Sequence, residues 1–387
     1  MSWYNVAMDY SQMSLEKHKQ YHGKISVVSK FGQINSKEDL SIAYTPGVAA
    51  VSLLLATQPE LASEYSIKGN TVAVVSDGSA VLGLGNIGPY GALPVMEGKA
   101  LLFKEFANID AFPIVLDTQD PDEIINIVKN IAPGFGGINL EDFNAPKCFY
   151  IEEKLKEILN IPVMHDDQHG TAIVVLAALI NSLKLAKKDV ATTKIIINGA
   201  GAAGSAIAKL LSLYGFKSIL MVDSQGCICK KRPNLDDIKK SYLEFINPEN
   251  IEGDLATVIK GQDVFIGVSK PNLVTPDMVK SMADKPIIFA LANPVAEIDP
   301  NLAKESGAFI VGTGRSDFPN QINNVLAFPG VFRGALDHHV SKITDEMKIA
   351  AAKALADYVS DTDLSVDNIL PSPLDKGVVQ VIAAAIK

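Results

Sequence analysis

The stretch that decides the fold is KIIINGAGAAGSAIAKLLSLYGFKSILMVD, which covers residues 194–223. An apolar run leads directly into the glycine pattern G-x-G-x-x-G, a helical pattern follows at once, and a second apolar run ends in Asp223. This order of strand, glycine turn, helix, strand and acid is typical of a dinucleotide-binding βαβ unit. It predicts a doubly wound, Rossmann-type parallel sheet.

Each glycine of this pattern has a physical task. Gly199 makes the tight turn, Gly201 lets the backbone approach a pyrophosphate, and Gly204 lets the helix and strand pack closely. Ala202 and Ala203 lie at the expected helix start, where unpaired N–H groups bind a pyrophosphate. We therefore expect these five residues to contact the cofactor.

The acid at the end of the second run sets the expectation for the cofactor's sugar. Asp223 can accept hydrogen bonds from the adenosine ribose hydroxyls, and its charge disfavours a 2′-phosphate, so NAD is the expected cofactor. Lys230, Lys231 and Arg232 follow closely and can meet a 2′-phosphate. Use of NADP as well therefore stays open.

The same glycine pattern occurs once more, at Gly83–Gly88, in different surroundings. It lies seven residues past the preceding apolar run, and Pro89–Pro94 separate it from the next helical pattern, Met96–Ala107. A pyrophosphate cannot reach that helix start through the same turn. We expect a loop that brings backbone close to a small substrate or shapes a cleft, with plain loop architecture as the alternative.

Apolar runs and helical patterns alternate along the rest of the chain, which is typical of an α/β protein. Most runs are continuously apolar, as expected for strands covered on both faces of a parallel sheet. They cover residues 71–76, 111–116, 194–198, 218–222, 263–268, 286–290 and 308–311. The best domain boundary lies near 161–170, so we predict two domains, 1–163 and 164–387. We expect alanine-rich helices at the end of the chain. We expect the active site in the cleft between the two domains.

Composition and charge exclude several classes of protein. The chain has 387 residues, 48% of them hydrophobic, and a formal net charge of −9 without a basic block. It can bury a large core unaided, and its charge argues against nucleic acid as a partner. The longest apolar stretch, Ala172–Ile180, is shorter than the about 20 residues of a membrane span. The start MSWYNVAMDY lacks the features of a targeting segment, so we expect a cytoplasmic location and no membrane partner.

Two pairs of adjacent acids, Glu141-Asp142 and Asp166-Asp167, lie at junctions between apolar elements. An acidic pair is most often solvated, but at such a junction a carboxylate tends to be buried or used. Sites made only of carboxylates suit Mg²⁺ or Mn²⁺. His165 and His169 are four residues apart and raise the alternative of zinc, although the segment lacks the His-Glu-x-x-His order.

Taken together, the motifs of this chain resemble those of the malic enzyme family in its short bacterial form. The matching segments are SIAYTPGVA (41–49), VSDG (75–78), GLGNIG (83–88), EGKA (97–100), LEDF (140–143), HDDQHGTA (165–172), the glycine pattern at 199–204, ANP (292–294), GRSD (314–317), NN (323–324) and FPG (328–330). They occur in the family's order. The resemblance implies oxidation of L-malate with a nicotinamide cofactor and decarboxylation to pyruvate and CO₂.

The resemblance also implies three catalytic residues. Lys99 would be the general base and Asp166 its partner, and Tyr44 would be the general acid. A lysine removes the C2 hydroxyl proton near neutral pH only if burial or a neighbouring cation lowers its pKa. A tyrosine protonates C3 of enolpyruvate if nearby positive charge lowers its pKa. Without the resemblance, Tyr44 would be a turn residue and Lys99 a solvated helix residue.

Ligands of the metal and the substrate follow from the same resemblance. Glu141, Asp142 and Asp167 would bind Mg²⁺ or Mn²⁺, which makes residues 1–163 the substrate and metal domain. Asn293 and Asn324 would hold the substrate carboxylate, with Asn293 also at the cofactor. The family further implies a homodimer.

In one place the chain departs from the long eukaryotic malic enzymes. These carry an arginine that contacts malate shortly before the Gly-Leu-Gly loop, where this chain has Ser79–Leu82. We therefore expect the asparagines, backbone donors of Gly83–Gly88 and the metal to hold the carboxylates, with Arg315 as an unassigned contributor.

Three competing functions remain open at this stage. An amino-acid dehydrogenase shares the two-domain plan and a catalytic lysine but needs no metal, so the paired carboxylates count against it. A metal-dependent oxaloacetate decarboxylase without redox turnover, and a nicotinamide-binding sensor, are the other two. A full set of tyrosine, lysine and carboxylates argues against a pure sensor.

Overall fold

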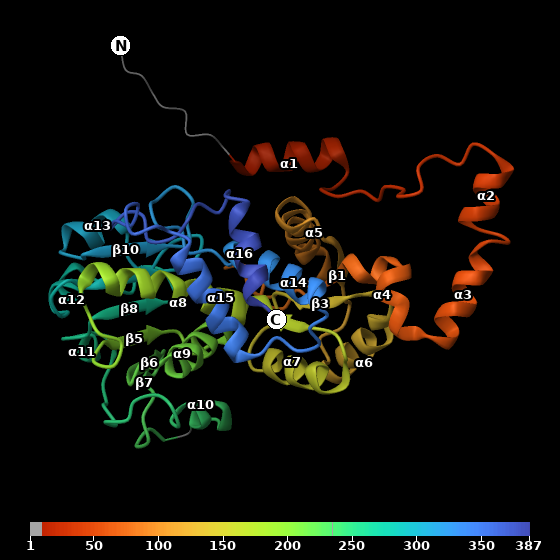
Figure 1. The fold of residues 1–387 in the computed structure, drawn as a ribbon. Helices are drawn as coiled ribbons and strands as arrows, with labels where there is room; N and C mark the ends of the chain where they lie inside the picture. The colour runs from red at the N-terminus through yellow and green to blue at the C-terminus, as the bar shows by residue number, and fades with distance from the viewer. Residues whose placement is uncertain (1–9, 234) are drawn as a thin grey trace, which may run out of the picture.

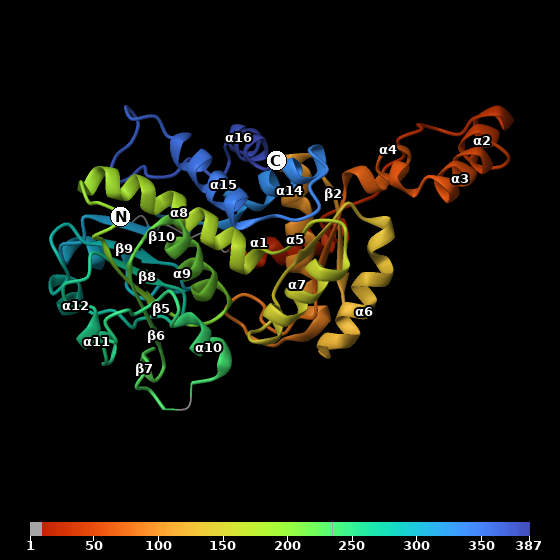
Figure 2. The same cartoon turned by 60° about the horizontal axis from the view of Figure 1, so that its bottom comes forward.

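The computed structural model describes residues 10–233 and 235–387. Almost all of the segment MSWYNVAMDY, on which the expectation about targeting rests, lies outside the described residues. Two sheets lie side by side with helices around them, and one arm, formed by α2 and α3, stands off the body (Figures 1 and 2).

The strands are β1 (Thr71–Ser76), β2 (Asp110–Val115), β3 (Gly137–Leu140), β4 (Val163–His165), β5 (Lys194–Asn198), β6 (Ser218–Asp223), β7 (Gly226–Cys227), β8 (Val264–Gly267), β9 (Ile287–Ala290) and β10 (Ile310–Thr313). The helices are α1 (Tyr10–Tyr21), α2 (Lys37–Ala43), α3 (Val48–Thr57), α4 (Ala62–Tyr65), α5 (Gly88–Ala107), α6 (Pro121–Ile131), α7 (Lys147–Ile158), α8 (Asp166–Ala186), α9 (Ala202–Tyr214), α10 (Asp237–Tyr242), α11 (Leu255–Val258), α12 (Pro276–Lys280), α13 (Pro300–Glu305), α14 (Phe328–Asp337), α15 (Asp345–Asp357) and α16 (Gly377–Ala385). Short 3₁₀ turns are η1 (Pro59–Leu61), η2 (Ile67–Asn70), η3 (Ala132–Gly134) and η4 (Asn324–Leu326).

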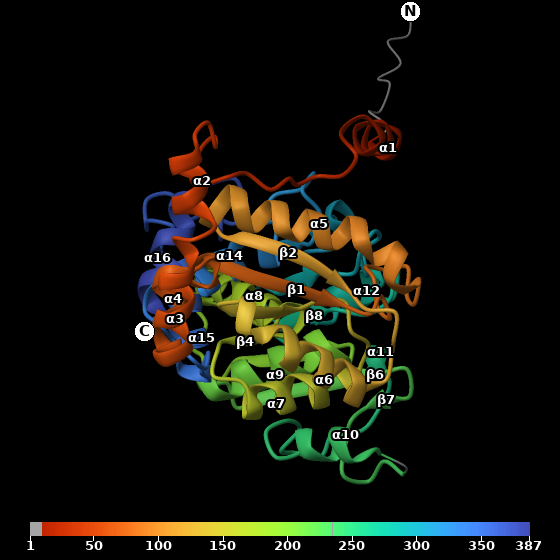
Figure 3. The same ribbon diagram turned by 90° about the vertical axis from the view of Figure 1, so that its right-hand side faces the viewer.

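The first sheet has four parallel strands in the order β2-β1-β3-β4. Helix α5 lies on one side of β1 and β2, and α6 and α7 lie on the other (Figure 3). The chain leaves β1 toward β2 on one side and returns to β3 on the other, which creates a switch point at the carboxyl ends of β1 and β3. Ligands of open α/β sheets bind at such points.

The second sheet has the order β10-β9-β8-β5-β6-β7, in which β7 alone runs antiparallel to its neighbour. Its switch point lies between β5 and β8, where the glycine turn 199–204 begins. This is the doubly wound parallel sheet that the sequence predicts.

One apolar core extends through both halves of the molecule. It includes Val72 and Val74 of β1, Phe103 of α5, nearly all of the middle of α8, and Ile195 of β5. Helix α8 is the connecting element, because it starts at the end of β4 and packs along α9. The two sheets are therefore parts of one packed body.

The end of the chain returns to the first sheet. The rings of Phe328 and Phe332 in α14 meet Phe103 of α5 edge to face, with centroids 4.8 and 5.4 Å apart. Helices α14, α15 and α16 gather on the same side of the molecule as α8 (Figure 2). The structure thus links the last helices to both halves, whereas the sequence assigns them to the second domain.

Three strands are absent from the predicted set, namely β3, β4 and β7. Each has four residues or fewer, and short runs give a weak periodic signal. Because β4 pairs with β3, the first sheet extends to His165, so the predicted division at 163/164 falls inside a strand of that sheet.

Helix α5 begins eight residues earlier than the sequence predicts. It starts at Gly88, the last glycine of the first glycine pattern, and contains Pro94. Proline lacks the N–H of a helix interior, so sequence reasoning starts the helix after it. The expectation that Pro89–Pro94 separate the glycines from the helix is therefore wrong.

The arm consists of α2, α3 and the segment between them. None of its residues is buried against the rest of the chain. Ser36 caps α2 in a reciprocal capping box with Asp39, so the helix is locally well formed although none of its residues is buried. Nearer the start of the chain, Lys24 ties the segment after α1 to α5, because its backbone N–H donates to Glu97 and its Nζ donates to the Pro94 carbonyl. The arm leaves the body after this point.

By length and composition alone, two segments could cross a membrane, Lys37–Thr57 and α8. The apolar window of α8 is 72% buried inside the core. The first segment is two helices of 7 and 10 residues, broken at Tyr44–Gly47, and each is far shorter than the about 20 residues of a span.

Candidate active site

A cluster of charged side chains lies at the carboxyl edge of the first sheet. Glu141 and Asp142 follow β3 directly, Asp166 and Asp167 open α8 after β4, and Lys99 reaches the cluster from the middle of α5. Parallel strands bring these segments to the same edge because their carboxyl ends coincide. The structure therefore brings together five of the site residues expected from the sequence.

Lys99 lies at the centre of the cluster. Its Nζ donates to Asp166 Oδ2 at 2.6 Å and lies 2.8 Å from Glu141 Oε1, and it is only 7% exposed. Burial acts to lower the pKa of Lys99, but the two carboxylates outweigh burial and hold the pKa above its ordinary value. Burial alone therefore does not make Lys99 a base, and a neighbouring cation is required.

Glu141, Asp142 and Asp167 each place one oxygen within 4.8 Å of the others. Asp142 Oδ2 is buried and has no hydrogen-bond partner within residues 10–233 and 235–387, and the Asp142 N–H donates to Asp167 Oδ2 at 2.8 Å. Asp142 also has a positive φ of 57°, a conformation that an aspartate rarely adopts without a structural reason. The arrangement aims carboxylate oxygens at one point.

The charges of the cluster do not balance. Four carboxylates face one ammonium, and burial followed by mutual repulsion raises the pKa of Asp142 and Asp167 above the ordinary value. An additional divalent cation removes most of this excess, and hard oxygen ligands suit Mg²⁺ or Mn²⁺. The residues present thus fit the expected ion.

The zinc alternative is not supported by the geometry. His169 pairs with Glu152 at 2.9 Å, and His165 Nε2 lies 3.9 Å from Asp167. Among the described residues, the group of ligand atoms that converge consists of the three carboxylates.

Two residues of the cluster are missed by sequence reasoning. Asn139 of β3 is buried and donates to Glu141 Oε2 at 2.8 Å, which fixes the orientation of that carboxylate. The ring of Phe328 lies under the ammonium of Lys99 with 4.2 Å between Nζ and the ring centroid. A polar residue inside an apolar strand was the available signal for Asn139, whereas only the fold brings Phe328 to Lys99.

Of the two asparagines expected to hold substrate, Asn324 lies beside the cluster and Asn293 lies against the Gly83–Gly88 loop. A Cβ on Gly170 would meet both the Asp166 carboxylate and Asn324, so Asn324 lies directly beside Asp166. A Cβ on Gly83 would clash with the carbonyl oxygen of Asn293. The Gly83–Gly88 loop therefore approaches the second half of the chain closely, as expected of a loop that shapes a cleft.

Arg315 is occupied elsewhere. Its guanidinium pairs with Asp317 through two hydrogen bonds of 2.8 and 2.6 Å and lies over the ring of Phe318. Both partners of the pair are exposed. The structure gives no contact of Arg315 with the cluster.

The glycine turn has the geometry that a pyrophosphate requires. Gly199 has a φ of 127° and lies against Val268 after β8, and Gly204 packs on Gly199, so neither place has room for a side chain. Open space surrounds the Cβ position of Gly201. Ala202 begins α9 and packs against the apolar residues of the first sheet, so the turn lies where the two halves meet.

Asp223 ends β6 next to this turn. The Gly199 N–H donates to the Val222 carbonyl at 2.9 Å, which fixes the distance between acid and turn. Burial acts to raise the pKa of Asp223, but hydrogen bonds from Arg232 and the Gln225 N–H hold the pKa below its ordinary value. The carboxylate is therefore charged and already bonded.

Tyr44 is the expected site residue that the structure does not bring to the cluster. It lies between α2 and α3 on the arm, 67% exposed, while Lys99 is buried in the body. Figures 1 and 2 show the arm well away from α5 and α7, which flank the cluster.

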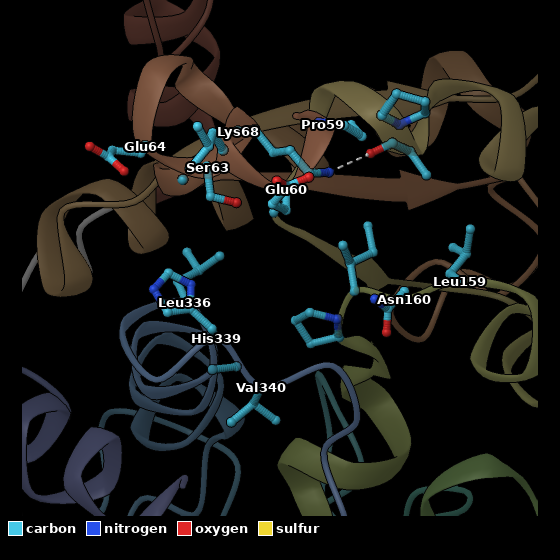
Figure 4. Close-up of a pocket in the computed structure, with 18 of the residues that line it drawn as sticks. Pro59, Glu60, Ser63, Glu64, Lys68, Leu159, Asn160, Leu336, His339 and Val340 are labelled. Carbon is cyan, nitrogen blue, oxygen red and sulfur yellow. Dashed lines mark hydrogen bonds between the residues drawn. The ribbon is translucent and has the colours of Figure 1, made fainter. Parts of the chain in front are cut away.

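A cavity of about 970 Å³ opens at the other edge of the first sheet. Figure 4 shows its walls, which come from the base of the arm (Glu60, Glu64), the end of α7 (Asn160) and the end of α14 (His339). Lys68 Nζ donates to the Ala132 carbonyl at 3.2 Å and to the Phe135 carbonyl at 2.6 Å. The cavity lies at the amino ends of β1 and β3, so it is separate from the carboxylate cluster.

Two family models match the chain and together cover most of it. The malic enzyme N-terminal domain matches residues 22–156, and the malic enzyme NAD binding domain matches residues 168–386.

Several malic enzymes, among curated proteins and solved structures, are similar to this chain over nearly its whole length. A bifunctional malic/malolactic enzyme of Bacillus subtilis is 54% identical over 98% of this chain and 92% of its own length. An NADP-dependent malic enzyme of Escherichia coli is 46% identical over 97% of this chain, which spans 51% of that protein. The crystal structure of an NAD-dependent malic enzyme from Thermotoga maritima is 51% identical, with a TM-score of 0.93 over 97% of this chain and 98% of that one.

Proposed function

The chain belongs to the malic enzyme family, and from this premise we propose that it oxidises L-malate with NAD or NADP and decarboxylates the product to pyruvate and CO₂. The observation that carries the proposal is the buried Lys99, bonded to Asp166 and Glu141 beside a three-carboxylate metal group. The glycine turn of the same chain lies next to the first sheet, because Ala202 packs against the apolar residues of that sheet.

Lys99 takes the proton from the C2 hydroxyl of malate. Asp166 holds the ammonium in place through its 2.6 Å hydrogen bond, and the ring of Phe328 fixes it from the other side. When bound, the divalent ion stabilises negative charge on the substrate oxygen and lowers the pKa of Lys99, and the nicotinamide accepts the C2 hydride. A positioned base of this kind contributes about 10²- to 10⁴-fold to the rate.

The substrate carboxylates are bound without an arginine. Asn324 lies beside Asp166, and Asn293 lies where the Gly83–Gly88 loop meets the second half. Amide and backbone N–H groups from these segments donate to the carboxylates. Because the donors come from both halves of the chain, substrate binding spans the cleft.

Tyr44 supplies the proton to C3 of enolpyruvate, and it does so in a second copy of the chain. Within one chain the arm holds Tyr44 away from Lys99, so each copy has a base without its acid. The chain is therefore a homodimer in which the arms are exchanged. Domain swapping of an identical element is a common route to such a dimer.

The exposed side chains of the arm support this assembly. Six large apolar side chains of the arm are exposed: Leu40, Ile42, Tyr44, Val48, Val51 and Leu53. Burial of apolar surface against a partner stabilises association by about 25 cal/mol per Å². An apolar surface of this kind on a protein marks an interaction site.

The assignment is tested by the absorbance of the reduced nicotinamide in the presence of malate, with and without Mn²⁺. At neutral pH, we expect reduction of NAD or NADP only when both malate and metal are present. Metal-dependent consumption of oxaloacetate without any reduction of the nicotinamide would assign the non-redox decarboxylase instead. Activity that does not depend on metal would contradict the role of the carboxylate group.

The assembly is tested separately by sedimentation velocity. A dimer that persists at micromolar concentration is expected. A monomer that is fully active would contradict the exchange of arms.

A further inference from the structure

The first turn of helix α8 carries two members of the carboxylate cluster. Asp166 accepts a hydrogen bond from Lys99, and Asp167 Oδ2 accepts one from the Asp142 N–H. His165, the N-cap of this helix, makes no capping hydrogen bond with its side chain. The position of the first turn, and with it the aim of the two carboxylates, therefore depends on other contacts.

The strand that leads into α8 lies at the edge of the first sheet. In the order β2-β1-β3-β4, strand β4 has a strand neighbour on one side only. An edge strand leaves backbone N–H groups without a strand partner. In β4 the N–H of its last residue, His165, donates to Glu152 Oε1 at 2.9 Å, and helix α7, which carries Glu152, packs against β4. Glu152 thus takes the place of a neighbouring strand where the chain turns into α8.

The second oxygen of Glu152 holds the other end of the same segment. Its Oε2 lies 2.9 Å from Nε2 of His169, one turn into α8. One buried carboxylate therefore bonds the residue before Asp166 and the second residue after Asp167. The two acids lie between the two points at which Glu152 holds the chain.

The charge of Glu152 is balanced outside the cluster. Lys156, one turn further along α7, lies 2.7 Å from Oε1. A second buried ammonium, that of Lys348 in α15, acts on Glu152 electrostatically and donates to Asp345 at 2.8 Å. The ligand atoms that converge on the expected metal position belong to three other carboxylates. Glu152 therefore acts on the cluster through the backbone at the start of α8, and not as a further ligand.

The ring of His165 does not hold this junction. It is buried beside the ring of Phe143, with 6.2 Å between the centroids. Neither ring nitrogen has a hydrogen-bond partner within the two described ranges, and Nε2 lies 3.9 Å from Asp167 Oδ2. The junction is held from α7 through the His165 backbone instead.

We propose that Glu152 is a positioning residue of the metal site, because its two hydrogen bonds fix the start of α8 and so aim the Asp167 carboxylate at the ion. The inference rests on the proposed function only in taking Glu141, Asp142 and Asp167 as the ligands. Loss of a group that orients a metal ligand lowers metal affinity about 10- to 100-fold. It would also leave the buried N–H of His165 without a partner.

Binding of Mn²⁺ tests this without any turnover of malate. Free Mn²⁺ is measured by electron paramagnetic resonance during titration of the full-length protein, and NADH binding is measured by fluorescence. Glu152→Asp keeps the charge but is one methylene shorter, so it cannot reach His165 and His169 together. Glu152→Gln loses the charge but keeps the length, and its amide can accept from the His165 N–H and donate to the other neutral tautomer of His169.

The two variants separate the effect of orientation from that of charge. We expect Glu152→Asp to weaken Mn²⁺ binding about 10- to 100-fold and Glu152→Gln to weaken it less than about 3-fold. The control is Glu153→Asp, at an exposed glutamate next to Glu152, and it should bind Mn²⁺ as the unmodified protein does. All variants should bind NADH equally well, because the glycine turn lies on other elements.

The reverse order, with Glu152→Gln weaker than Glu152→Asp, would show that the charge of Glu152 acts on the ion from a distance, and it would overturn the proposal. Equal losses of Mn²⁺ and NADH binding in Glu152→Asp would overturn it too, because they indicate a general loosening of the fold. If circular dichroism shows that Glu152→Asp is unfolded, Glu152→Gln decides alone: a folded variant whose Mn²⁺ binding is weakened more than about tenfold contradicts the proposal. An unmodified protein that binds NADH but not Mn²⁺ would instead contradict the metal site of the proposed function.

Discussion

The carboxylate cluster and the arm both carry residues expected to be catalytic, but they are built in opposite ways. Lys99, Asp166 and Glu141 converge from three segments of one chain and are buried in contact with one another. Tyr44 lies on a segment that buries nothing in its own chain. Parallel sheet topology assembles the first region within one chain, whereas we propose that the second region acts in another chain.

The largest effect is expected for Lys99→Ala. Loss of the base should lower kcat about 10³- to 10⁴-fold. The substitution also leaves two buried carboxylates without their cation, so its melting temperature is measured by circular dichroism alongside kcat. Lys104→Ala, an exposed lysine on the same helix, is the control and should keep full activity. A folded Lys99→Ala protein whose kcat is within tenfold of that of the unmodified protein would show that another residue is the base.

The next effect tests the exchange of arms directly. Tyr44→Phe should lower kcat about 10²-fold because only the acid is removed. When Tyr44→Phe and Lys99→Ala chains are unfolded and refolded together in equal amounts, about a quarter of the sites regain both groups in a swapped dimer. The measurement is the activity of the mixture.

A tyrosine that acts within its own chain gives no such recovery, because every site then lacks one of the two groups. Recovery also shows that the Lys99→Ala chain is folded, since it donates the intact arm.

A smaller effect is expected when the arm is made polar. Leu53→Glu places a charge in the proposed interface and should weaken dimerisation by about 10- to 100-fold, at about 1.4 kcal/mol for each factor of ten. Sedimentation velocity over a dilution series measures it, and activity should fall with the dimer. The control is Leu213→Glu, a similarly exposed leucine on α9 of the body. An unchanged dimer with Leu53→Glu would move the interface away from the arm.

The smallest effect concerns an ion pair of the body. Burial acts to raise the pKa of Asp345, but Lys348 and Lys209 outweigh burial and lower the pKa to about 2. The pKa of Asp345 in the folded protein lies below the unfolded value of 3.8. The contribution of this ion pair to folding stability is therefore complete above about pH 4 and is lost as pH falls toward 2. Asp345→Asn should therefore cost about 1 kcal/mol at pH 7 and nothing near pH 2, after a discount for partial exposure.

Chemical denaturation at several pH values measures this cost. Asp361→Asn, an exposed aspartate after α15, is the control and should leave stability unchanged. A constant cost of Asp345→Asn over the whole pH range would show that packing, and not charge, is responsible.

Sequence reasoning predicted the second sheet well because its strands are continuous apolar runs around a recognisable glycine turn. Periodicity and glycine chemistry alone predict the strand at 194–198 and the glycine turn 199–204 that follows it. The first sheet was predicted less completely, because β3 and β4 are too short to give a pattern of their own.

The site was predictable in part. Paired acids at apolar junctions indicated a metal group, but Lys99 and Tyr44 came only from the family resemblance. The contact of Phe328 with Lys99 joins residues more than two hundred positions apart, so no local pattern encodes it. Local sequence also does not identify what covers the arm, because the apolar side chains of the arm would equally predict a helix buried within the same chain.

The shared core has a consequence for how this chain can be divided and recombined. A cut at 163/164 separates Phe103 from Phe328 and Phe332, and it divides β4, the strand that leads into α8. Neither piece is then a self-sufficient module, although each contains a complete ligand-binding switch point. A chimera that exchanges the nucleotide-binding half must leave α14 with the half on which it packs. The smallest part of this protein that can be exchanged intact is therefore the whole chain.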